Sequence, residues 1–131
     1  MIRISVREII TKNVVAVTPN TPIRRVAEIM HNNNIGSVLI VDNDGRLLGI
    51  FTERDLVKAV ALGVDLNIPV ENFMTTKLVT ATPNESIASI AHKMIENWIR
   101  HIPVVDEQNR AIGVLSIRDV LRAYIAGLAF P

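Results

Sequence analysis

Two short segments of the chain place a carboxylate three residues after a hydroxyl side chain. They are Thr52-Glu-Arg-Asp55 and Ser116-Ile-Arg-Asp119. If such a segment opens a helix, the helix N-terminus and the hydroxyl suit a phosphate, because free N–H groups and the positive end of the dipole face it. The carboxylate can accept hydrogen bonds from two adjacent hydroxyls, which is what a ribose presents. The same spacing also fits a capping box, which only satisfies the backbone N–H groups of the first turn.

Other kinds of chemical site are disfavoured by the composition. The chain has no cysteine, which excludes disulfides, thiolate metal sites and cysteine nucleophiles. His31, His92 and His101 do not have the spacing of a zinc motif, so we expect no metal site. The sequence offers no recognisable nucleophile–base pair and no glycine-rich phosphate loop, so we predict no catalytic residues and no enzyme activity.

Charge and hydropathy limit the partners of the chain. Its 131 residues include 14 Lys and Arg against 13 Asp and Glu, with a net charge of +1. Nucleic-acid-binding domains commonly carry a basic patch, so this balance disfavours a nucleic acid partner. No apolar run approaches the roughly 20 residues that span a membrane, and charges interrupt the N-terminus where a signal peptide has its apolar stretch. We therefore expect a cytoplasmic location and no membrane segment.

The two segments belong to an internal repeat. When the sequence is shifted by 64 residues, positions 6–58 align with 70–122 without a gap. Identical pairs recur along this alignment, among them Val6 and Val70, Thr11 and Thr75, Met30 and Met94, and Val41-Asp42 and Val105-Asp106. The repeat predicts two halves, residues 1–64 and 65–131, which together form one globular chain.

Each half has the pattern of a small α/β (α+β) unit in the order β-α-β-β-α. In the first half we predict strands at 14–17, 38–41 and 46–51, and helices that start at Thr21-Pro22 and at Glu53. In the second half we predict strands at 78–81, 101–105 and 110–115, and helices at 86–97 and 116–126. Short helices at 6–10 and 70–74 would lead into the halves. We expect the two sheets to pack together with approximate two-fold symmetry.

Aliphatic residues are more abundant than a small soluble chain requires. Hydrophobic residues make up 49% of the sequence and aromatic residues only 4%, and the mean hydropathy is +0.31. Small proteins need a large polar exterior because their surface is large relative to their volume. We therefore expect another subunit to cover part of the apolar surface.

These motifs together resemble a tandem pair of cystathionine-β-synthase-type (CBS) domains. Both Gly49-Ile-Phe-Thr-Glu-Arg-Asp55 and Gly113-Val-Leu-Ser-Ile-Arg-Asp119 fit the family pattern of Gly, two hydrophobic residues, Ser or Thr, two variable residues and Asp. Ile102-Pro-Val-Val-Asp106 is similar to the family's second strand. The resemblance implies a regulatory module that binds AMP, ADP, ATP or S-adenosylmethionine, needs no catalytic cofactor, forms a homodimer and acts on a target protein.

The resemblance also implies two ligand sites, each walled by residues of the other half. In the family the Asp contacts the ribose and the hydroxyl supports it. The first site would contain Thr52, Arg54, Asp55, Met74, Lys77, Val79, Ile99, Arg100 and His101. The second would contain Ser116, Arg118, Asp119, Ile10, Asn13, Val15, Ile35, Gly36 and Ser37. Since Lys77, Arg100 and His101 stand where the other site has Asn13, Gly36 and Ser37, we predict stronger phosphate binding at the Asp55 site.

Two other functions stay open at this point. A CBS pair that has lost ligand binding would serve only as a structural or assembly module, although both Asp residues are present. A nucleic-acid-binding regulator is the other alternative, and the near-neutral charge disfavours it.

Overall fold

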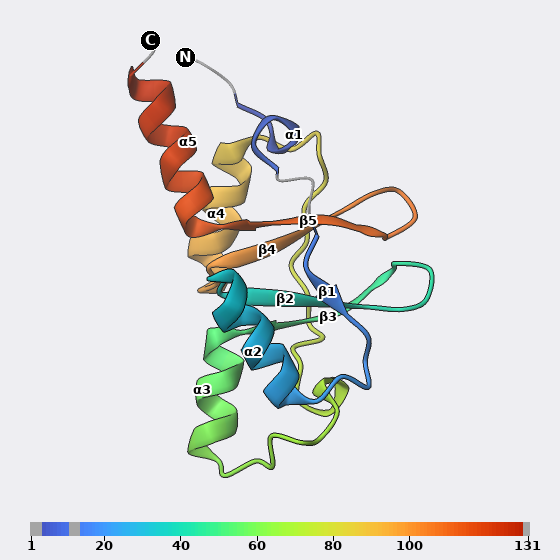
Figure 1. The fold of residues 1–131 in the computed structure, drawn as a ribbon. Coiled ribbons are helices and arrows are strands. Elements are labelled where there is room, and N and C mark those ends of the chain that lie inside the picture. The colour runs from blue at the N-terminus through green and yellow to red at the C-terminus, as the bar shows by residue number, and fades with distance from the viewer. Residues whose placement is uncertain (1–3, 11–13, 130–131) are drawn as a thin grey trace. The chain divides into compact units, whose positions relative to one another are not determined.

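The computed structural model describes residues 4–10 and 14–129 of the chain. It has the predicted α/β (α+β) content, and its elements follow the order β-α-β-β-α in the first repeat (Figure 1). The chain divides into two compact units. Unit 2 holds residues 15–78 and 109–111, and unit 1 holds the described parts of residues 1–14, 79–108 and 112–131.

Unit 2 is built on a three-stranded sheet. Its elements are β1 (Ala16–Val17), α2 (Ile23–Asn33), β2 (Ser37–Val41), β3 (Leu47–Thr52), α3 (Glu53–Ala61) and the 3₁₀ turn η1 (Val70–Asn72). β2 lies in the middle, parallel to β1 and antiparallel to β3. The core of the unit consists of Ile23, Val26, Met30, Val38, Ile40, Phe51 and Val70. On α2 the buried residues recur at helical spacing, which turns one face of the helix to the sheet.

The start of α2 differs by one residue from the prediction. Pro22 is the N-cap and has extended dihedral angles, and no side chain caps the helix. The Thr21 hydroxyl lies 3.3 Å from that of Thr18, within the turn that precedes the helix. The helix predicted to start at Thr21-Pro22 therefore begins at Ile23, and the Thr21 hydroxyl belongs to the preceding turn.

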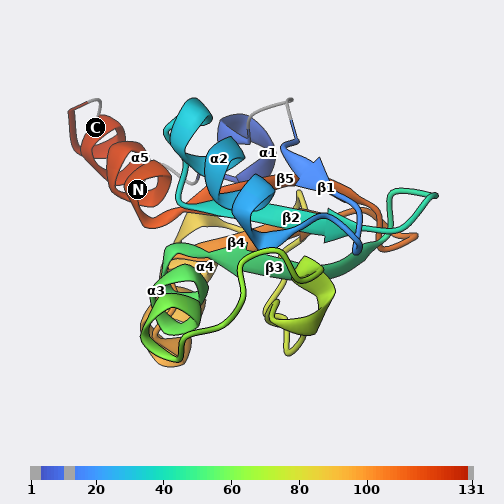
Figure 2. The same cartoon turned by 60° about the horizontal axis from the view of Figure 1, so that its bottom comes forward.

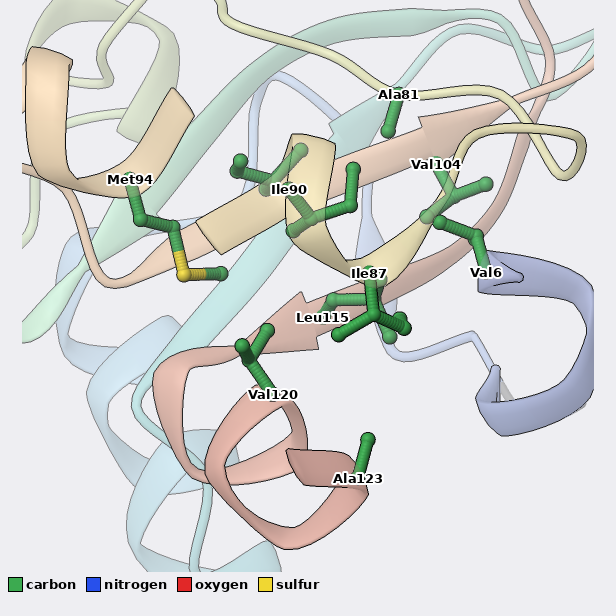
Figure 3. Close-up of a cluster of buried hydrophobic side chains, with 10 residues drawn as sticks. Val6, Ala81, Ile87, Ile90, Met94, Val104, Leu115, Val120 and Ala123 are labelled. Atoms are coloured by element: carbon green, nitrogen blue, oxygen red, sulfur yellow. The ribbon is translucent and has the colours of Figure 1, made fainter. Parts of the chain in front are cut away.

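Unit 1 has a two-stranded sheet of β4 (His101–Val105) and β5 (Ala111–Ser116), with the helices α1 (Val6–Ile9), α4 (Ile87–Asn97) and α5 (Ile117–Ala129). α4 packs against both α5 and β4. Figure 3 shows the core between these elements, where residues from α4, β4, β5 and α5 point toward one another.

The prediction of a strand at 78–81 is wrong, because this segment forms a single β-bridge. Ala81 N donates to Pro103 O and Val105 N donates to Ala81 O, both at 2.9 Å. In the first repeat the ladder extends further because Leu39 N donates to Val15 O at 3.2 Å. Pro103 occupies the position equivalent to Leu39 and has no N–H group, so the second repeat cannot form that bond.

The short segments that lead into the repeats are exchanged between the units. Val6, at the start of the first repeat, is fully buried in the core of unit 1, which contains most of the second repeat. Val70, its equivalent, is fully buried in the core of unit 2. The backbone bonds match as well: Val6 N donates to Glu85 O at 2.9 Å, and Val70 N donates to the equivalent Thr21 O at 2.7 Å. The compact units therefore do not follow the sequence repeat residue for residue.

A polar cluster in unit 1 holds the turn before α4. The Glu85 carboxylate accepts hydrogen bonds from Lys93 Nζ, from Thr82 N at 2.8 Å and from the Ser89 hydroxyl at 3.2 Å. Burial raises the pKa of the Glu85 carboxyl, but these hydrogen bonds and the charge of Lys93 outweigh it, so the pKa lies below its ordinary value.

We expect Glu85→Gln to lower the free energy of unfolding by about 1 kcal/mol at pH 7, since the cluster is partly exposed. A carboxyl whose pKa is lowered in the folded state stabilises the fold above its unfolded pKa and loses this effect as the pH falls through the lowered value. The difference from wild type should therefore shrink below about pH 4.3. Urea unfolding at several pH values measures it, with the exposed Glu107→Gln as control. A difference that did not change with pH would contradict the ion pair.

Among residues 4–10 and 14–129, no helix is both long enough and apolar enough to cross a membrane.

Candidate functional site

Both hydroxyl–carboxylate segments lie where a strand passes directly into a helix. β3 ends at Thr52 and α3 begins at the next residue, while β5 ends at Ser116 and α5 follows it (Figures 1 and 2). This direct junction places each carboxylate on the first helical turn, beside the last residue of the strand. The predicted strand-to-helix position of the two motifs is confirmed.

The capping box predicted as one interpretation is present at both junctions. Asp55 Oδ2 accepts hydrogen bonds from Thr52 N at 2.9 Å and from Thr52 Oγ1 at 3.2 Å. Asp119 Oδ2 accepts from Ser116 N at 2.8 Å and from Ser116 Oγ at 2.9 Å. In each box a single carboxylate oxygen takes both bonds, so capping leaves the second oxygen unused.

The second oxygens have different surroundings. Asp55 Oδ1 accepts a hydrogen bond of 3.0 Å from the Thr75 hydroxyl. Asp119 Oδ1 lies 4.0 Å from the guanidinium of Arg122, which is an ion pair without a hydrogen bond. Both aspartates are half-buried. Among the described residues, the two carboxylates are therefore alike as caps and differ in the neighbour of the second oxygen.

Fewer backbone N–H groups are free at the helix starts than the phosphate interpretation requires. Glu53 N donates to Gly36 O at 3.1 Å, and Ile117 N donates to Arg100 O at 2.8 Å. The N–H groups of the two aspartates donate to the cap hydroxyls, at 3.4 Å in α3 and 3.1 Å in α5. The expectation that these N-termini present free N–H groups to a phosphate is therefore wrong for these positions.

Gly49 of the first motif has a structural reason. A Cβ atom built at this position would lie 2.5 Å from Met74 Sδ and 3.0 Å from Thr75 O, both too close. The segment after η1 therefore runs directly against β3, where Thr75 and Ile50 exchange two backbone hydrogen bonds. Glycine allows this approach without displacing the Met74 side chain or the Thr75 backbone.

Unit 2 contains nine of the residues that the resemblance assigned to ligand sites. They are Val15, Ile35, Gly36, Ser37, Thr52, Arg54, Asp55, Met74 and Lys77. Val15, Ile35 and Met74 pack against the unit's own hydrophobic core. Lys77 and Arg54 are exposed. Of the nine, the structure places Thr52 and Asp55 in direct hydrogen-bond contact.

Unit 1 contains eight more, which are Ile10, Val79, Ile99, Arg100, His101, Ser116, Arg118 and Asp119. Ile10, Val79 and Ile99 pack against this unit's core. Arg100 and Arg118 are exposed, and Arg100 contacts the start of α5 through its carbonyl. Asn13 lies outside the described residues. Each predicted site draws on both units, and the assignment of these residues to shared sites stays a prediction.

Sequence reasoning did not assign Thr75 to either site. Thr75 lies twenty residues after Asp55 and outside both motifs. The identity of Thr11 and Thr75 in the repeat was the available signal, because a hydroxyl kept in both repeats at a lead-in segment needs an explanation.

The repeat and its two junctions define a pair of CBS domains. The CBS domain family matches residues 6–62 and again residues 70–126. The chain therefore belongs to this family, as its motifs predicted.

Similar proteins extend over nearly the whole chain. A 17.7 kDa protein of Acidianus ambivalens is 37% identical over 120 residues, which is 92% of this chain and 73% of that protein. Several other relatives, including a homoserine O-acetyltransferase of Methanococcoides burtonii and an inosine-5′-monophosphate dehydrogenase of Methanocaldococcus jannaschii, are longer, and the chain spans 22% to 44% of their length.

Two solved structures of similar proteins contain adenosine compounds. The CBS domain pair of protein MJ0100, in complex with 5′-methylthioadenosine and S-adenosylmethionine, has a TM-score of 0.89 and 31% identity over 96% of this chain and 99% of its own. The CBS domain protein PAE2072 of Pyrobaculum aerophilum, complexed with AMP, has a TM-score of 0.87 and 30% identity, and the match covers 98% of this chain and all of its own, 100%.

Proposed function

We propose that this chain is a regulatory module that binds an adenosine-containing nucleotide, such as AMP, ADP or ATP, in the cleft between its repeats and modulates a target protein. The proposal depends most on one observation: at both junctions the cap fixes the aspartate through Oδ2, so the second carboxylate oxygen takes no part in capping. A half-buried, preorganised carboxylate oxygen of this kind is suited to the vicinal hydroxyls of a ribose.

Similar structures support the chemical class of the ligand. AMP, 5′-methylthioadenosine and S-adenosylmethionine share the adenosine group and differ in what the 5′ carbon carries. A site that selects the ribose and the adenine would accept all three. Aliphatic residues at the margins of the two cores, such as Val15 and Val79, would provide apolar contacts for an adenine face.

A thermal-shift screen of AMP, ADP, ATP, S-adenosylmethionine and NAD tests the proposal. A ligand at 100 times its dissociation constant should add about 2.7 kcal/mol to the free energy of unfolding. Guanosine and cytidine monophosphates serve as controls for the base. If no adenosine compound raised the melting temperature, the proposal would fail and the structural or assembly function would be favoured. A salt-dependent shift of labelled RNA or DNA would instead support the nucleic-acid alternative.

We also propose that the chain forms a homodimer through α3 and α5. Val57 and Val60 on α3 are 68% and 62% exposed, and their repeat equivalents on α5, Leu121 and Tyr124, are 56% and 43% exposed. Apolar side chains therefore recur at the same helical positions in both repeats. A second copy of the chain presents the same surfaces, so a two-fold dimer can cover them.

Light scattering after size exclusion measures this association. Wild type is expected to elute as a dimer and Leu121→Glu as a monomer, because a carboxylate in an apolar interface must be desolvated. The exposed α4 variant Ala88→Glu adds the same charge elsewhere and should stay dimeric. A monomeric wild type would contradict the dimer without affecting the ligand proposal.

A further inference from the structure

Residues 4–7 bind the turn before α4 in the way that an extended peptide binds a protein. Val6 N donates to Glu85 O at 2.9 Å, and Arg7 N donates to Pro83 O at 3.0 Å. The contact also has a third backbone bond and an antiparallel bridge, which are Ile87 N to Ile4 O at 2.9 Å, and Ser5 with Ser86. Main-chain hydrogen bonds of this kind give peptide ligands their affinity when they add to a protein as a strand.

One side chain anchors this segment in unit 1. Val6 has no exposed surface and points toward Val104 in the core (Figure 3). Ile4, Ile9 and Ile10 pack against the same core. We call the turn 82–87, together with the core side chains that receive Val6, the docking surface. It combines backbone bonds with a buried anchor, as surfaces that recognise extended peptides do.

The chain uses this interaction a second time, in unit 2. Ile68-Pro-Val70 meets the turn before α2, where Val70 N donates to Thr21 O at 2.7 Å. Its pattern Ile-x-Val is also that of Ile4-Ser-Val6. Each segment lies far in the sequence from the turn that receives it, so the contacts hold it there and not a short chain connection. The same contacts are therefore available to a segment of another chain.

Arg7 distinguishes the two segments. Its Nη2 atom donates to Asn84 Oδ1 at 2.9 Å, next to the bonds of the backbone. Glu71 occupies the equivalent position in the other segment and has no side-chain proton to donate when it is ionised. The docking surface of unit 1 therefore fits residues 4–7 better than residues 68–71.

We propose that this docking surface also accepts residues 4–7 of a second copy of the chain. Each copy carries both the segment and the surface, so two copies can occupy each other's surfaces reciprocally and form a closed two-fold pair. The contacts at the docking surface are the same in both arrangements. Within one chain the segment has an effective concentration of about 1 mM, so the exchanged pair grows with protein concentration. The inference depends neither on the adenosine ligand nor on the apolar residues of α3 and α5.

Single-cysteine variants test this inference, because the chain itself has no cysteine. Facing residues of an antiparallel bridge have Cα atoms about 4.5 to 5.5 Å apart, which suits a disulfide. Ser5→Cys and Ser86→Cys chains are mixed and oxidised, and mass spectrometry measures the disulfide that joins position 5 of one chain to position 86 of the other. We expect its yield to rise about tenfold when the protein concentration rises about tenfold below 1 mM.

Three controls make the result decisive. Ala88→Cys replaces Ser86→Cys to measure random collisions, since Ala88 is exposed on α4 close to the bridge. Adding Val6→Asp to the Ser5→Cys chain removes the anchor and should lower the yield about tenfold or more. The double variant Ser5→Cys/Ser86→Cys should close its disulfide within one chain at low concentration.

Two results would overturn the inference. The first is a closed disulfide in the double variant together with a yield in the mixture no higher than with Ala88→Cys, or unchanged by Val6→Asp. The segment would then dock only within its own chain. The second is a double variant that stays open, because the docking itself would then be absent.

Discussion

Replacing Val6 by Asp is expected to destabilise the second repeat, although Val6 belongs to the first repeat in the sequence. Val6 has no exposed surface, and Figure 3 shows it pointing toward Val104 in the core of unit 1. An unpaired carboxylate buried among aliphatic side chains has no hydrogen-bond partner and must be desolvated or protonated. We expect the free energy of unfolding to fall by roughly 3 kcal/mol or more.

Amide hydrogen exchange locates this effect. In Val6→Asp, exchange should accelerate first in α4, β4 and β5, and less in α2 and β2. Ala88→Asp adds the same charge on the exposed side of α4 and should change the free energy of unfolding by less than about 0.5 kcal/mol. If amide hydrogen exchange accelerated only in α2 and β2, the assignment of the Val6 segment to the core of unit 1 would be contradicted.

Asp119→Asn is expected to lower the affinity for AMP about 100-fold, which corresponds to about 2.7 kcal/mol. The amide oxygen of Asn can still accept from Ser116 N, so the helix cap is largely kept. The charge is lost, however, and hydrogen bonds from a ribose to a charged acceptor are stronger than those to a neutral one.

Calorimetric titration of AMP into wild type, Asp119→Asn and Asp55→Asn measures the contribution of each carboxylate. Glu107→Gln removes an exposed carboxylate elsewhere in the chain and should bind AMP as wild type does. We expect a loss of affinity in each of the two aspartate variants. Unchanged affinity in both would contradict the role of these carboxylates in ligand binding.

The sequence-based hypothesis about phosphate is tested separately. Lys77, Arg100 and His101 favour phosphate binding at the Asp55 site, and that remains a prediction. The contributions of phosphate and ribose are separable, since a nucleoside without phosphate reports only on the ribose and the base.

Most of the fold follows from the sequence because hydrophobic periodicity and the repeat report on local structure. The helix at Ile87–Asn97 with its Ser86 cap and the hairpins of both repeats lie within a few residues of their predicted positions. The prediction of a strand at 78–81 was wrong. Its own pattern is aliphatic enough for a strand, but the neighbouring strand has Pro103 where a backbone N–H donor is needed. A strand forms only if its neighbour supplies the matching backbone hydrogen bonds, and the hydrophobic pattern of one segment does not report on the neighbour.

The exchange of the lead-in segments could not be predicted. The identity of Val6 and Val70 indicates that they have equivalent environments in the two repeats. It does not indicate which repeat provides each environment, because both cores are aliphatic and of similar composition. Backbone hydrogen bonds to Glu85 and Thr21, far away in the sequence, decide the matter.

The candidate site was predicted in its local parts. Thr52 with Asp55 and Ser116 with Asp119 are close in the sequence, so their spacing reports their geometry. The capping interpretation and the ribose-binding interpretation of this spacing are compatible, because capping uses one carboxylate oxygen and leaves the other. Thr75 was missed because it reaches Asp55 through pairing with Ile50, a contact between segments that no local motif encodes.

The central claim is that the chain recognises the ribose of an adenosine ligand through the aspartate oxygens that the caps at Asp55 and Asp119 do not use. The most direct measurement compares the calorimetric affinities of AMP and 2′,3′-dideoxy-AMP for the wild-type chain. The two ligands share base and phosphate and differ only in the two hydroxyls. We expect the dideoxy compound to bind about 100-fold more weakly, as in Asp119→Asn. Equal affinity for the two compounds, or no binding of AMP, would contradict the claim.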